Sequence, residues 1–87
     1  MELKHLLWGS ATAVMVGAPV TAQTQVEFWH AFTGRLGELV AAQVETFNNS
    51  QSDYVVEATH KGNYSETLNA GIAAFRAGEQ PDILMVF

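Results

Sequence analysis

The first half of the chain changes from a strand-like to a helix-like pattern of hydrophobic positions. Gln25–His30 is rich in residues that favour strands, and the turn Ala31–Gly34 follows it, with Thr33 available as a helix cap. From Arg35 onwards, hydrophobic residues recur at three- and four-residue spacing, as on one face of an α-helix. The polar run Asn48–Asp53 is expected to end this helix. The hydrophobic stripe comprises Leu36, Leu39, Val40, Val44 and Phe47.

The second half repeats the change from strand to helix and adds a third strand. Tyr54–His60 alternates between apolar and polar positions, which suits a strand at the edge of a sheet. Ser65–Ala77 has helical spacing, and Gly78 is expected to terminate it. Ile83–Phe87 is five apolar residues without alternation, the pattern of a strand buried on both faces.

The element order is therefore β-α-β-α-β, which predicts an α/β fold with a parallel sheet. An edge-like second strand and a doubly buried third strand favour the spatial order 2-1-3, with one helix on each face. The connections from the first and third strands then diverge, which creates the kind of crevice that binds ligands in α/β sheets. We expect His30–Gly34 and the residues after Phe87 to line it. A doubly buried last strand needs a further strand beside it, so these residues are expected to be the front of a longer protein.

The amino-terminal segment has the three parts of a secretory signal. A short polar start is followed by the apolar run Leu6–Val16, a break at Gly17–Pro19, and small residues at Val20–Ala22. The apolar run is too short to span a bilayer, which takes roughly 20 residues. We expect residues 1–22 to be a signal peptide cleaved after Ala22, and residues 23–87 to be exported to the periplasm.

The composition limits the classes of partner. The formal net charge is −5, and phosphate backbones are bound by clustered Lys and Arg, so nucleic acid is not an expected partner. The chain has no Cys, so no disulfide stabilises it and no lipid-modified cysteine stands at the cleavage site. A soluble periplasmic product is favoured over a lipoprotein.

The turn from His60 to Tyr64 is the stretch most suited to ligand contact, because it joins a strand carboxyl end to a helix amino end. Gly62 supplies backbone freedom, and Asn63 with Glu66 has the spacing of a capping box. Tyr64 is then the first helical residue, a position where folding requires no aromatic ring. We predict Tyr64 as the ligand-binding residue.

The remaining candidate residues show weaker signs of a functional role. His30 and His60 end predicted strands but lack a third partner at metal-binding spacing, so we expect hydrogen-bonding histidines and no metal. Lys61 is interpreted as a solvated charge and Trp29 as a core residue. Neither a nucleophile elbow nor a phosphate-binding loop is present, so no catalytic residue or cofactor is predicted. An enzyme using either histidine as a base is the competing class, and it lacks a supporting constellation.

Several motifs follow one another along the mature stretch: Phe28-Trp29-His30, Gly37-Glu38-Leu39, Phe47-Asn48, Lys61-Gly62-Asn63-Tyr64, Ala70-Gly71-Ile72-Ala73-Ala74-Phe75-Arg76, and Pro81 with Ile83-Leu84 and Val86. Together, and in this order, they resemble periplasmic solute-binding proteins of ABC importers, most closely the members that bind sn-glycerol 3-phosphate. The motifs Lys61–Tyr64 and Ala70–Arg76 are the specific part, whereas Phe28–His30 is shared by many sugar binders.

The resemblance implies the first part of one lobe of a type II-like, two-lobed protein that closes over its ligand. It implies a non-enzymatic, substrate-binding component of an importer, capturing sn-glycerol 3-phosphate and delivering it to inner-membrane permease subunits with a cytoplasmic ATPase. The family's ligand-contact tyrosine corresponds to Tyr64. A family glutamate that also contacts the ligand, just after the third strand, would fall beyond Phe87. The residue before that glutamate is commonly Tyr in the family, and this chain has Phe87 there. The alternatives are a binding protein for a neutral sugar or oligosaccharide, and a truncated fragment without activity.

Overall fold

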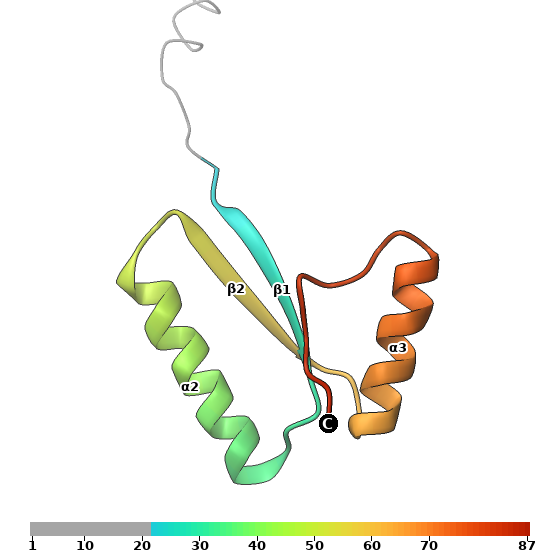
Figure 1. Ribbon diagram of the computed structural model, residues 1–87. Helices are drawn as coiled ribbons and strands as arrows, with labels where there is room; N and C mark the ends of the chain where they lie inside the picture. The colour runs from blue at the N-terminus through green and yellow to red at the C-terminus, as the bar shows by residue number, and fades with distance from the viewer. Residues whose placement is uncertain (1–21) are drawn as a thin grey trace, which may run out of the picture.

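The computed structural model of the chain describes residues 22–87, and the five predicted elements occur in the predicted order (Figure 1). The expected signal peptide, apart from Ala22, lies outside the described residues. The strands are β1 (Thr24–His30), β2 (Tyr54–His60) and β3 (Ile83–Leu84). The helices are α2 (Gly34–Ser50) and α3 (Tyr64–Arg76).

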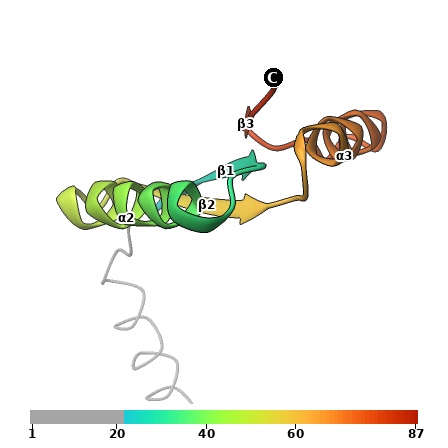
Figure 2. The same cartoon turned by 90° about the horizontal axis from the view of Figure 1, so that it is seen from below.

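The three strands form a parallel sheet in the order β2-β1-β3, which confirms the predicted fold class and strand order. β1 pairs with β2 along its whole length, from Thr24 opposite Tyr54 to His30 opposite His60. Viewed from below, α2 and α3 lie on opposite sides of the sheet (Figure 2). The carboxyl ends of all three strands therefore share one edge, with one helix beginning on each side of it.

Helix α2 extends past the point where the polar loop was expected to end it. Thr33 occupies the N-cap position but its side chain makes no capping hydrogen bond. At the other end, Asn48 is still helical, and its amide donates to the carbonyl oxygen of Val56 at 2.9 Å and accepts from the N–H of Val56 at 2.8 Å. These two bonds hold Asn48 against the edge strand. The helix continues to Ser50, so the predicted helix end at Asn48 is wrong.

Helix α3 begins with the predicted capping box. The Asn63 side chain accepts from the N–H of Glu66, and the Glu66 carboxylate accepts from the N–H of Asn63, each at 2.8 Å. Gly62 precedes the cap with φ of 119°, a conformation that favours glycine. Gly71 faces β3 so closely that a Cβ atom there would lie 2.6 Å from Leu84 Cδ2. The helix thus needs a glycine at position 71 to approach the sheet.

The third strand is shorter and more exposed than its apolar sequence predicted. Only Ile83 and Leu84 are paired as a strand, opposite Phe28 and Trp29, and Ile83, Val86 and Phe87 are exposed. The expectation of a strand buried on both faces is therefore wrong for the described residues, in which no further strand adjoins β3.

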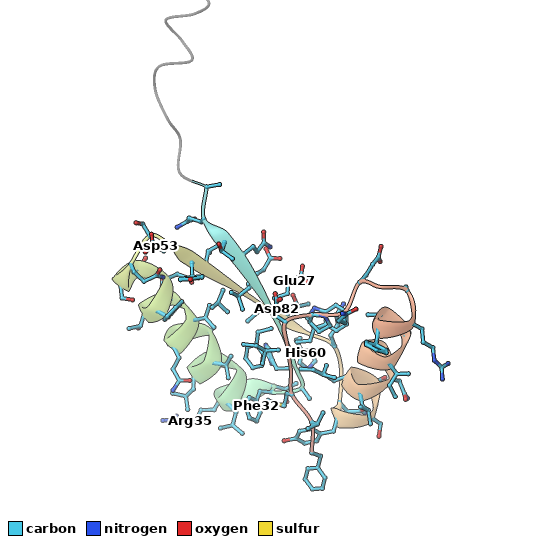
Figure 3. The ribbon with its side chains drawn as sticks, turned by 45° about the horizontal axis from the view of Figure 1, so that its top comes forward. Glu27, Phe32, Arg35, Asp53, His60 and Asp82 are labelled. Carbon is cyan, nitrogen blue, oxygen red and sulfur yellow. The ribbon has the colours of Figure 1, made fainter. Side chains whose placement is uncertain are left out.

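The pairing of β3 with β1 is extended by a side chain at its amino end. Asp82 donates its N–H to the carbonyl oxygen of Glu27 at 3.0 Å, and its carboxylate accepts from the N–H of Glu27 at 2.8 Å. Glu27 and Asp82 consequently lie beside each other (Figure 3).

Burial is shallow throughout residues 22–87. No hydrophobic side chain of this part is fully buried, and the buried polar residues are His30 and Thr67. Thr67 bridges the sheet and the turn, because its hydroxyl lies 3.5 Å from the carbonyl oxygens of both His30 and Gly62. Neither helix of this part is long and apolar enough to cross a membrane.

Candidate functional site at the carboxyl edge of the sheet

Segments from all three strands meet at the carboxyl edge. The Lys61 N–H donates to the carbonyl oxygen of His30 at 2.9 Å, which continues the β1–β2 pairing one residue beyond the strands. The Met85 N–H donates to the carbonyl oxygen of Trp29 at 2.9 Å, and the Ala31 N–H approaches the Met85 sulfur at 3.5 Å. Phe32, Arg35 and His60 lie toward this end of the sheet, and Asp53 lies toward the other (Figure 3). The turns after β1 and β2 are thereby held next to each other.

Tyr64 stands where the sequence placed it, as the first residue of α3 at this edge. Its side chain is 40% exposed, and its ring centroid lies 5.1 Å from that of Phe87 in a tilted arrangement. The hydroxyl has no hydrogen-bond partner among residues 22–87. An exposed ring with an uncommitted hydroxyl can contact both an apolar carbon skeleton and a polar oxygen of a ligand. The structure thus gives the position of Tyr64, while its part in binding stays a prediction.

His30 is the most enclosed residue at the edge, with a relative exposure of 7%. Its ring lies between aromatic neighbours, with centroid distances of 5.5 Å to Phe28, 6.4 Å to Phe32 and 5.8 Å to His60. Its Nδ1 accepts the N–H of Phe32 at 3.2 Å. Burial, followed by the neighbouring His60, lowers the pKa of His30 below its ordinary value of 6.5. His30 thus makes a hydrogen bond, as expected of both histidines, whereas His60 is exposed and its ring has no hydrogen-bond partner among residues 22–87.

Lys61 and Trp29 contact each other, which the separate interpretations of a solvated charge and a core residue did not foresee. The Lys61 Nζ lies 3.9 Å from the centroid of the Trp29 ring, within the range of a cation–π contact. Both side chains are partly buried. The register explains the contact: Trp29 pairs with Thr59, and Lys61 is two residues further on, so it projects from the same face of the sheet. The edge therefore holds a positive charge in a defined place.

In residues 22–87, no group of three or more His, Cys, Asp or Glu is positioned to hold a metal ion. A shallow hollow lined by Arg35, Glu38 and Leu39 belongs to α2 alone, so it gathers none of the predicted site residues. The amino end of α3 has a positive dipole end, which favours anions, but the capping box commits the Glu66 N–H to Asn63 and places the Glu66 carboxylate at the same end.

The chain is similar in sequence to several sn-glycerol-3-phosphate-binding periplasmic proteins named UgpB. It is 49% identical over 77 residues to the protein of Brucella abortus, which covers 88% of this chain and 18% of that protein. It is 45% identical over 91 residues to that of Agrobacterium fabrum and 39% identical over 87 residues to that of Salmonella typhimurium. Each of these two matches covers 100% of this chain, and they cover 21% and 20% of the relatives respectively.

The chain thus spans about a fifth of the length of the curated relatives it matches. No protein-family model matches it. The small parallel sheet with a helix on each side is consistent with part of a binding-protein lobe. The resemblance read from the sequence is therefore confirmed: this chain is similar, over its whole length, to part of the periplasmic solute-binding proteins of the sn-glycerol-3-phosphate-binding type.

Proposed function

We propose that this chain is the amino-terminal part of the first lobe of a substrate-binding protein that captures sn-glycerol 3-phosphate in the periplasm. The observation that carries the proposal is the 49% identity over 77 residues to a protein with that printed name. The protein so formed is not an enzyme: it binds its ligand and presents it to inner-membrane permease subunits, which a cytoplasmic ATPase drives. Glycerophosphodiesters share the glycerol phosphate group and are included in the proposal as further ligands.

The proposed contact residue is Tyr64. Its place at the amino end of α3 lets the hydroxyl meet a phosphate or polyol oxygen while the ring covers the carbon skeleton. The helix amino end supports the binding of an anion. A neutral sugar would use the same ring, so the preference for a phosphorylated polyol rests on the similarity to the named relatives.

Residues 1–22 are proposed as a signal peptide and residues 23–87 as the first, incomplete part of the binding lobe. Export with cleavage after Ala22 makes Gln23 the new amino terminus. Mass spectrometry of a periplasmic extract should find a peptide that begins at Gln23. Intact Met1 on the protein from a soluble cytoplasmic pool would refute this assignment.

The role of Tyr64 is tested by removing its hydroxyl in the full-length protein. Tyr64→Phe removes a hydrogen bond to a charged group, so calorimetric titration with sn-glycerol 3-phosphate should show affinity lower by about tenfold or more. Tyr54→Phe is the matched control, because Tyr54 is also exposed but begins β2 at the opposite edge of the sheet. The control should bind like the unmodified protein.

The two outcomes against the proposal are distinct. Equal affinity of the Tyr64→Phe variant and the unmodified protein would remove Tyr64 from the site. Preference of the unmodified protein for an uncharged disaccharide over sn-glycerol 3-phosphate would replace the class of ligand.

A further inference from the structure

A buried histidine with one hydrogen-bonded ring nitrogen ends the central strand of the sheet. His30 ends β1, which lies between β2 and β3, and its side chain is more than nine-tenths buried. Its Nδ1 is occupied by the Phe32 N–H at 3.2 Å. Its Nε2 has no hydrogen-bond partner among residues 22–87. Within this part of the chain, no side-chain nitrogen or oxygen that is sealed from solvent lacks a partner, so Nε2 keeps some contact with solvent.

The bond to Phe32 determines which nitrogen carries the proton. A neutral imidazole has one donor and one acceptor nitrogen, and here Nδ1 must accept. The proton of neutral His30 is therefore on Nε2, which becomes an outward hydrogen-bond donor. The lowered pKa, caused by burial and by His60, keeps the ring neutral near neutral pH.

This tautomer also determines which ligands the nitrogen can hold. A metal ion needs a nitrogen lone pair, and the only one of neutral His30 is used by the Phe32 N–H. His60 faces the ring at 5.8 Å but makes no hydrogen bond to it. An N–H donor with no partner in the described part of the chain, at the carboxyl end of the central strand, suits an oxygen acceptor on a small ligand.

We propose that His30 is a second ligand-contact residue, which donates its Nε2–H to an oxygen of the bound ligand. The proposal rests on the function proposed above and adds to it a neutral donor from β1, on the central strand, to complement Tyr64 from α3. A neutral N–H donor can bond a hydroxyl oxygen or a phosphate oxygen, so His30 contributes a directed hydrogen bond to either kind of ligand group.

Two substitutions test the two ring nitrogens separately. Asn at position 30 can accept the N–H of residue 32 in an Asx turn, which reproduces the Nδ1 bond but offers no donor at the Nε2 position. Gln reaches the Nε2 position with an amide donor but does not reproduce the short turn. His30→Asn should therefore retain stability and lose affinity, and His30→Gln should do the reverse.

Both variants are made in the full-length protein and titrated with sn-glycerol 3-phosphate by calorimetry, with thermal unfolding measured in parallel. We expect His30→Asn to bind about tenfold more weakly, the loss that follows from removing a hydrogen bond to a charged ligand. His30→Gln should bind within about threefold of the unmodified protein but melt at a lower temperature. His60→Asn makes the same chemical change at the paired, exposed position of β2 and should leave affinity unchanged.

A spectroscopic measurement separates ligand contact from a structural role. With histidine labelled by ¹⁵N, the ligand-free protein should show His30 as the Nε2–H tautomer, and saturation with sn-glycerol 3-phosphate should shift the Nε2–H signals. A Nδ1–H tautomer, or Nε2–H signals unchanged by bound ligand, would overturn the inference.

The binding data distinguish the two proposals. Unchanged affinity of His30→Asn, together with a loss in Tyr64→Phe, would overturn the role of His30 and leave the proposed function standing. If both position-30 variants lost affinity in proportion to their loss of thermal stability, His30 would have a structural role only. No binding of sn-glycerol 3-phosphate by the unmodified protein would instead overturn the proposed function.

Discussion

The side chain of Asn48 substitutes for a neighbouring strand along the outer edge of β2. Its amide bonds both the N–H and the carbonyl oxygen of Val56, at 2.8 and 2.9 Å, so it satisfies two backbone groups that point away from β1. Asn48→Ala removes both bonds at once. Each such bond contributes about 0.5–1.5 kcal/mol net, so the loss is about 1–3 kcal/mol.

The substitution also changes helix propensity, which needs a control. Ala favours a helix over Asn by up to about 0.7 kcal/mol, which offsets part of the loss. Asn49→Ala makes the same change at the next position of α2, where the side chain is exposed and has no hydrogen-bond partner among the described residues. The difference between the two variants therefore isolates the two hydrogen bonds to Val56.

The assay is urea denaturation of the full-length protein with amide hydrogen exchange at Val56. Asn48→Ala should unfold at lower urea and exchange the Val56 N–H faster, whereas Asn49→Ala should match or slightly exceed the unmodified stability. Equal stability of the two variants, with Val56 protection intact in both, would refute the claim that Asn48 closes the edge.

Two further predictions concern packing and pH. Gly71→Val should lower the free energy of unfolding by about 1–3 kcal/mol, because a side chain there collides with Leu84. The control Ala73→Val, at an exposed position of the same helix, should lower it less. Equal losses of stability in urea denaturation would contradict this prediction. The folded state binds fewer protons than the unfolded state when the pKa of His30 is below 6.5, so this residue's contribution to stability is present above pH 6.5 and is lost as the pH falls below it. Burial and, after it, the neighbouring His60 oppose protonation of the ring, so His30→Asn should flatten the fall in stability between pH 7.5 and 5.5. An unchanged slope would contradict this reasoning.

The sequence predicted the elements and their order because each depended on local spacing or on burial in the sheet. The capping box of α3 is a local signal, and the strand Tyr54–His60 has the predicted boundaries. The end of α2 was missed because it depends on contacts across the polar loop. The Asn48 amide bonds Val56, and the Gln51 amide accepts from the N–H of Tyr54, and neither contact is visible in periodicity.

The sequence overestimated how deeply the third strand is buried. An apolar run indicates that a strand needs neighbours on both sides, and the described residues supply a neighbour on one side only. Ile83 has β1 on one side, and no described strand lies on the other. The position of Tyr64 was predictable because it followed from the cap at Asn63. The contacts of Lys61 with Trp29 and of Tyr64 with Phe87 were not, because they depend on register and on where the chain passes after β3.

Calorimetric titration of the full-length protein with sn-glycerol 3-phosphate, and in parallel with maltose, tests the central claim most directly. We predict saturable binding of sn-glycerol 3-phosphate and no detectable heat from the uncharged disaccharide. Saturable binding of maltose without binding of sn-glycerol 3-phosphate would contradict the proposed function.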